Sequence, residues 1–105
     1  MEWFHRLYAG RLIASRREEI VRDIDAGKTP SGVYLLALPE NQRNLLEFYS
    51  AKELKNPYLR EHPPMIVGIA FGKDEALFLT ERIVSDVYRA RGDVDVRAWI
   101  CQMQG

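Results

Sequence analysis

The chain has 105 residues, of which 47% are hydrophobic and 29% are charged. This length suits one domain with one core, and the apolar fraction excludes a disordered, strongly charged chain. Fifteen basic residues balance fifteen acidic ones. The zero net charge argues against non-specific nucleic-acid binding as the main activity, because such binding usually needs a basic excess. The single cysteine, Cys101, excludes an intrachain disulfide.

The sequence shows no pattern typical of secretion or of a membrane span. The first residues lack the basic-then-apolar layout of a secretory signal, and the longest apolar run ends at Lys73, far short of a membrane span. We therefore expect a cytoplasmic protein with one domain over residues 1–105, an N-terminal helical segment 1–27 included.

The first predicted element is helical. Apolar residues in the segment 3–26 recur at spacings of three, four and seven, and Gly27 is suited to end a helix. Gly10 weakens this helix, and the spacing of Ser15 and Glu18 matches a capping box. The pattern therefore leaves open one long helix or a short helix before a second one.

A first strand and a second helix follow. Residues 33–38 are apolar on both faces and come after turn residues, which predicts a strand that Pro39 closes. Asn41 is suited to cap the next element. The apolar pattern of residues 45–54 then predicts a helix that ends near Asn56.

The strongest local pattern is the apolar run from Met65 to Phe71, which passes through Gly72 into an amphipathic helical pattern. One face of this strand is expected to hold Met65, Val67, Ile69 and Phe71, and the other Ile66, Gly68 and Ala70. The following helix is expected to end at Gly92. A buried strand that feeds a helix indicates an α/β fold.

The last predicted element is an edge strand. Apolar and polar residues alternate from Val94 to Ile100, with Trp99 on the polar face. The element order is then αβαβαβ. Two strand-helix-strand units favour a small three-stranded, mainly parallel sheet with helices packed over it, and they leave the direction of the last strand open.

The turn at Gly72 and Lys73 is the first candidate site. A turn between a strand and a helix can direct backbone N–H groups at an anion, although this one fails as a Walker A loop. Asn41 and Arg43 follow the first strand, and ligands of open parallel sheets bind beyond the carboxyl ends of strands. A small anionic ligand is therefore one hypothesis, provided that the two loops share one cleft. The plainer interpretation, turn chemistry and solvated loops, is favoured.

Catalytic and metal sites are not expected. Cys101, His5 and His62 carry no recognisable nucleophile signature, and they lack the close spacing of zinc ligands. We therefore expect a non-enzymatic protein with no catalytic residue, no metal and no cofactor.

The N-terminal segment is locally basic, with Arg6, Arg11, Arg16 and Arg17 against Glu2. Contact with RNA, a membrane surface or an acidic partner is a minor hypothesis for it. The plainer interpretation is a helix that covers the sheet and keeps its arginines in water.

Association is the leading hypothesis. A three-stranded sheet leaves edges and apolar surface to cover, and large aromatic residues are common in interfaces. These considerations select Trp3, Phe4, Tyr8 and Trp99 as contact residues. We therefore expect an interaction or regulatory module that forms a homodimer or another homo-oligomer and engages a protein partner, with binding of a small anionic ligand as the alternative.

Overall fold

The computed structural model describes residues 1–41 and 44–104, and its centre is a four-stranded sheet in the order β1-β4-β2-β3. The strands are β1 (Glu2–Ala9), β2 (Val33–Ala37), β3 (Glu47–Ser50) and β4 (Met65–Phe71). β1 runs parallel to β4, whereas β2 is antiparallel to both β4 and β3. The fold is therefore an α/β fold with a mixed, mostly antiparallel sheet, whose outer strands are β1 and β3.

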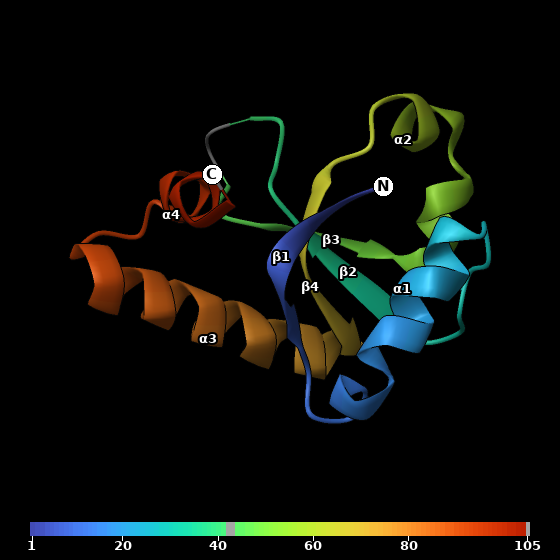
Figure 1. Ribbon diagram of the computed structural model, residues 1–105, viewed down its shortest axis with the longest axis horizontal. Coiled ribbons are helices and arrows are strands. Elements are labelled where there is room, and N and C mark those ends of the chain that lie inside the picture. The colour runs from blue at the N-terminus through green and yellow to red at the C-terminus, as the bar shows by residue number, and fades with distance from the viewer. Residues whose placement is uncertain (42–43, 105) are drawn as a thin grey trace.

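Helices cover both faces of this sheet (Figure 1). They are α1 (Arg17–Asp25), α2 (Pro57–Glu61), α3 (Lys73–Arg91) and α4 (Val96–Gln104), with the short 3-10 helices η1 (Ala14–Arg16) and η2 (Ala51–Lys55). α3 and α4 pack on one face, while α1 and η2 pack on the other. The central strands are consequently covered on both sides.

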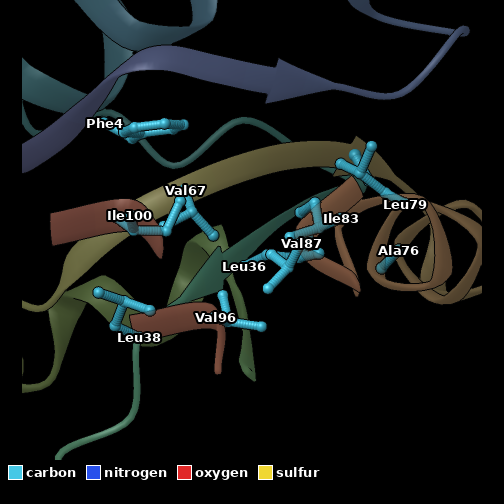
Figure 2. Packing of buried hydrophobic residues seen from close by; sticks show 11 residues of the cluster. Phe4, Leu36, Leu38, Val67, Ala76, Leu79, Ile83, Val87, Val96 and Ile100 are labelled. Carbon is cyan, nitrogen blue, oxygen red and sulfur yellow. The ribbon is translucent and has the colours of Figure 1, made fainter. Parts of the chain in front are cut away.

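Buried side chains form two hydrophobic clusters, one on each face of the sheet. On the face toward α3 and α4, Figure 2 shows Ile83 and Val87 of α3 beside Leu36 of β2, and Ile100 of α4 beside Val67. The opposite cluster consists of Leu7, Ile13, Ile20, Ile24, Val33, Leu35, Ala37, Ala51, Leu54, Ile66 and Ile69. Removing this apolar surface from water supplies the main favourable free energy of folding.

Four elements agree with the sequence prediction, namely β2, β4, α3 and α1, the last of which matches the second helix left open before Gly27. α3 follows β4 directly and ends before Gly92, whose φ of 81° is left-handed. The N–H of Gly92 donates to the Tyr88 carbonyl at 2.7 Å. Glycine adopts this conformation without steric cost, so it acts as the predicted cap.

The prediction of a helix at the start of the chain is wrong, because the chain enters the sheet as β1 and becomes helical only at η1 and α1. Phe4 and Tyr8 pack toward α3 and α4, whereas Trp3 and Leu7 pack toward the opposite face. A strand covered on both faces lacks the alternation of apolar and polar residues. The apolar spacings of one, three and four in β1 therefore matched a helical stripe.

The helix predicted at residues 45–54 is also wrong, because β3 followed by η2 takes its place. Phe48 packs toward the α3 face and Tyr49 toward the other, so this strand again has apolar residues on both sides. Ser50 and Glu53 form a capping box that starts η2, with the Ser50 N–H donating to the Glu53 carboxylate at 2.6 Å. The sheet thus has four strands instead of the predicted three.

The predicted last strand is the helix α4. Val96 and Ile100 are four residues apart, a spacing that fits one face of a helix as well as one face of a strand. The Asp95 carboxylate accepts a hydrogen bond of 3.0 Å from the Ala98 N–H, which caps the first turn. The mainly parallel sheet is corrected as well, since β2 is antiparallel to β4 and the parallel pair is β1 with β4.

A bulge in β4 changes which face its side chains reach. Leu36 pairs with Gly68, yet the next residue, Ala37, pairs with Ile66, so Val67 is an extra residue opposite β2. The α3 face consequently receives Met65, Val67, Gly68 and Ala70, and the opposite face receives Ile66 and Ile69. The regular alternation predicted for this strand is therefore wrong from Gly68 onward.

Candidate functional site

A shallow hollow of about 840 Å³ opens where the outer strand β1 meets the second half of α3. Its polar lining consists of Arg6, Arg11, Arg17, Arg82, Arg89, Tyr8 and Asp86, and Trp99 of α4 contributes a large ring. We call this surface the arginine groove. Five guanidinium groups and one carboxylate make it strongly basic, although the whole chain carries no net charge.

The fold brings these residues together from three parts of the chain. On β1, Phe4 and Tyr8 pack toward α3 and α4, and Arg6, which lies between them in the sequence, lines the same groove. On α3, Arg82, Asp86 and Arg89 are separated by four and three residues, which places them in one row. The irregular turn after β1 supplies Arg11, and the first residue of α1 is Arg17.

A polar network joins β1 to α3 across the groove. The Tyr8 hydroxyl donates to Asp86 Oδ2 at 2.6 Å, and Arg89 Nη2 donates to Asp86 Oδ1 at 2.8 Å. The guanidinium carbon of Arg82 lies 5.4 Å from the centroid of the Tyr8 ring, a cation–π distance. Burial raises the pKa of Tyr8 above its ordinary value of 10.0, and the hydrogen bond and charge of Asp86 raise it further. The phenol therefore remains a donor at neutral pH.

The arginines differ in what they already bind. Arg17 Nη1 donates to the Leu7 carbonyl at 3.1 Å, and Arg89 is paired with Asp86. Arg6 and Arg11 are exposed, and neither side chain has an ion pair or hydrogen bond within residues 1–41 and 44–104. Their donors are therefore free for an external acceptor.

Trp99 forms an aromatic floor with two residues of β1. Its ring centroid lies 6.3 Å from that of Phe4 and 6.4 Å from that of Tyr8, both in tilted arrangements. Phe4 is buried, with 2% of its surface exposed, whereas Tyr8 and Trp99 are half-buried. The groove thus offers a flat ring beside its guanidinium groups.

Side chains already bind the outward backbone of β1. Gln104 of α4 accepts from the His5 N–H at 2.9 Å, and its amide nitrogen donates to the Trp3 carbonyl at 3.3 Å. The Arg17 side chain likewise donates a hydrogen bond to the Leu7 carbonyl. These contacts take the place of a further strand, so they protect this edge from strand addition.

The two loops expected to hold an anion lie at opposite ends of the sheet. The Leu38 N–H donates to the Met65 carbonyl at 3.0 Å, which places the loop of Asn41 at the start of β4. Gly72 and Lys73 follow the end of that strand. The predicted common cleft is therefore wrong, and Arg43 lies outside the described residues.

At the Gly72 turn, a carboxylate of the chain itself binds nearby backbone N–H groups. The Glu75 carboxylate accepts from the Phe71 N–H at 2.9 Å and from the Leu12 N–H at 3.1 Å. The Gly72 N–H donates to the Gly32 carbonyl at 2.8 Å. These backbone donors thus have internal partners, and Lys73 lies beside them at the surface.

The four predicted interface aromatics separate into different environments. Tyr8 and Trp99 line the groove, and Phe4 belongs to the core beneath it. Trp3 lies on the opposite face of the sheet, where its indole N–H donates to Asp25 at 2.9 Å. Sequence reasoning missed the contribution of α3, because charges spaced by three and four residues on a helix resemble an ordinary solvated face.

The described residues also bear on metal binding, on the position of Cys101 and on membrane spans. No group of three or more His, Cys, Asp or Glu side chains is arranged to hold a metal ion there, and Cys101 is an exposed residue of α4. Among the residues that the structure describes, no helix is long and apolar enough to cross a bilayer. Comparisons with protein-family models, curated proteins and solved structures gave no match. Fold and groove define a small α/β protein with an arginine-lined surface at one sheet edge.

Proposed function

We propose that the protein is a non-enzymatic interaction module that binds an anionic partner in the arginine groove. The observation that carries this proposal is the convergence of five arginines of which two, Arg6 and Arg11, have no internal partner in the described chain. Like charges gathered in one hollow repel one another until an anion compensates them. Guanidinium groups suit that purpose because they grip carboxylates and phosphates with paired hydrogen bonds.

The proposal is tested by removing the two free arginines. The double variant Arg6→Ala/Arg11→Ala and the matched control Arg22→Ala/Arg60→Ala lose the same charge, but Arg22 and Arg60 lie outside the groove. Binding to fluorescent heparin and to polyglutamate is measured at low salt. We expect the groove variant to bind at least about tenfold more weakly than the control to one of these polyanions, since two charge-assisted hydrogen bonds are removed. Equal affinities for both would refute the proposal.

Self-association is a second candidate function, and the charge at the other edge of the sheet favours it. A hollow beside β3 is lined by Glu40, Glu47 and Glu53 against Lys52. Tyr49 lies among these carboxylates, donating to Glu47 at 2.7 Å, and burial together with the nearby glutamates raises its pKa. Because β1 and β3 are the two outer strands, the basic edge of one copy complements the acidic edge of another.

This arrangement predicts head-to-tail contacts between copies, and a mixing experiment tests it. Sedimentation at micromolar concentration and low salt is measured for the wild type, Arg82→Glu and Glu47→Arg. We expect association of the wild type, loss of association in each variant, and its recovery when the two variants are mixed, because opposite charges then face each other again. A wild-type protein that sediments as a monomer would exclude both this arrangement and the homodimer expected from the sequence.

A further inference from the structure

The chemistry of the groove narrows the kind of anion that fits it. All five of its cationic side chains are arginines, while the four lysines of the chain, Lys28, Lys52, Lys55 and Lys73, lie elsewhere. A guanidinium group is planar and weakly hydrated, so it both holds a phosphate with two hydrogen bonds and stacks on an aromatic ring, whereas an ammonium group acts as a point charge. The groove is thus suited to ligands that combine phosphates with flat rings.

Aromatic rings lie between these cations. Trp99 lines the groove and is held in place by Phe4 and Tyr8, and Arg82 lies over the Tyr8 ring. A basic groove that tracks a phosphate backbone and offers rings for stacking is the usual way in which proteins bind single-stranded nucleic acid. A duplex keeps its base faces stacked internally, so it has no comparable use for Trp99.

The closed edge of β1 argues against the main competing partner, an extended acidic peptide. Peptides commonly bind at a sheet edge by adding a strand, which requires free backbone groups. Along β1, the Gln104 side chain is hydrogen-bonded to the His5 N–H and to the Trp3 carbonyl, and the Arg17 side chain donates to the Leu7 carbonyl. A nucleic acid needs none of these groups, because its phosphates and bases are bound by side chains.

The zero net charge of the chain argues against nucleic-acid binding over its whole surface, but it does not exclude a local site. Charges interact strongly within a Debye length of about 10 Å, so the local arrangement decides what a surface attracts. The one carboxylate that lines the groove, Asp86, is bonded to Tyr8 and paired with Arg89. Three of the chain's glutamates lie together at the opposite edge of the sheet.

We infer that the anionic partner of the arginine groove is single-stranded nucleic acid, with phosphates held by the arginines and a base stacked at Trp99. This inference rests on the proposed function of the groove and names its ligand class. RNA and single-stranded DNA share the phosphates and the base faces, so both are offered in the test.

The two tryptophans of the chain allow a direct readout. Trp3→Phe leaves Trp99 as the only tryptophan, and Trp3 lies on the opposite face of the sheet. This reporter protein is titrated with a thymidine oligonucleotide and a uridine oligonucleotide of about ten residues each, lengths typical of such sites. We expect quenching of Trp99 fluorescence by at least one of them, and an affinity that falls as salt rises.

Variants connect this binding to the groove. In the reporter background, the slope of log affinity against log salt is negative, and Arg6→Ala/Arg11→Ala should reduce its magnitude by about 1.4, at about 0.7 for each phosphate that is no longer neutralised. Arg22→Ala/Arg60→Ala should leave the slope unchanged. In the wild-type background, Trp99→Ala should weaken oligonucleotide binding about fivefold or more, whereas Trp99→Phe, which keeps a ring, should weaken it less.

Several outcomes would overturn the inference. If polyglutamate binds in the groove and the oligonucleotides neither bind nor quench Trp99, the partner bears carboxylates, and the proposed function survives without this ligand. If duplex DNA binds as tightly as either single strand, base stacking plays no part. If neither polyglutamate, heparin nor an oligonucleotide binds in a manner sensitive to Arg6 and Arg11, the inference and the proposed function both fail.

Discussion

The hydroxyl of Tyr8 donates a hydrogen bond of 2.6 Å to the carboxylate of Asp86, two residues that are 78 positions apart in the chain. This contact joins the outer strand β1 to the long helix α3 at the floor of the arginine groove. It also neutralises part of the one negative charge that lines the groove, because Asp86 receives both the phenol and the Arg89 guanidinium. The shape and the charge of the groove therefore depend on the same pair.

Replacing Tyr8 by phenylalanine should lower the free energy of unfolding by about 1–2 kcal/mol, because the part-buried Asp86 loses one of its donors. Urea unfolding followed by circular dichroism measures this change. Tyr88→Phe is the matched control on α3, since Tyr88 is 60% exposed and should change stability by less than about 0.5 kcal/mol. Equal effects of the two substitutions would show that the Tyr8 hydrogen bond adds nothing to stability.

The same residue predicts how stability depends on alkaline pH. Burial, together with the Asp86 hydrogen bond, raises the pKa of Tyr8 in the folded state above its ordinary value of 10.0. The contribution of the protonated phenol is complete below that pH and is lost as the pH rises, because the unfolded chain releases the proton first. The stability difference between the wild type and Tyr8→Phe should therefore shrink from about pH 9 to about pH 11 in urea titrations. A constant difference would contradict a raised pKa.

Gly68 allows α3 to pack closely on the sheet. A Cβ atom at this position would lie 3.0 Å from Leu79 Cδ2 and 3.4 Å from Tyr8 Cβ. Gly68→Ala should therefore destabilise the fold by about 1–3 kcal/mol, as overpacked core substitutions do. The double variant Gly68→Ala/Leu79→Ala should be less destabilised than the sum of its single variants, since the shortened side chain relieves the clash. Additive effects, measured by urea unfolding, would exclude this contact as the cause.

Gln104 should protect the backbone of β1. In Gln104→Ala the His5 N–H loses its acceptor, so its hydrogen-exchange protection should fall by at least about fivefold, in line with the removal of one hydrogen bond. Gln102→Ala is the matched control, because Gln102 lies on the same helix and is exposed. Exchange followed by NMR at His5 should be unchanged in that control. We also expect Gln104→Ala to aggregate at lower concentration, since an uncovered edge can pair with another chain.

The sequence predicts an element correctly where the spacing of its apolar residues has one clear period. The run from Met65 to Phe71 and the helix that follows were predicted correctly because an apolar strand, a glycine turn and an amphipathic stripe occur in immediate succession. The sequence does not predict β1 and β3 as strands, because each has apolar side chains on both faces. Neighbours such as Phe48 and Tyr49 therefore point in opposite directions. The sequence predicts a strand in place of α4, because the spacing of Val96 and Ile100 fits the period of a strand as well as that of a helix.

The groove could be predicted only in part. The basic character of the segment with Arg6, Arg11 and Arg17 is visible in the sequence, and these residues do line the groove. The contribution of Arg82 and Arg89 depends on the pairing of β1 with β4, which places α3 beside the start of the chain. No local pattern encodes that pairing, because it joins strands separated by more than half of the sequence.

This pairing also determines when the groove can exist. β1 ends at Ala9, but its neighbour in the sheet, β4, begins only at Met65. Gln104, which hydrogen-bonds the outer edge of β1, is 99 positions beyond His5. A growing chain on the ribosome therefore carries β1 without its sheet neighbour until residues 65–71 have emerged. Contacts of such long range form late in folding. The arginine groove should therefore form only after α3 and α4 have emerged from the ribosome.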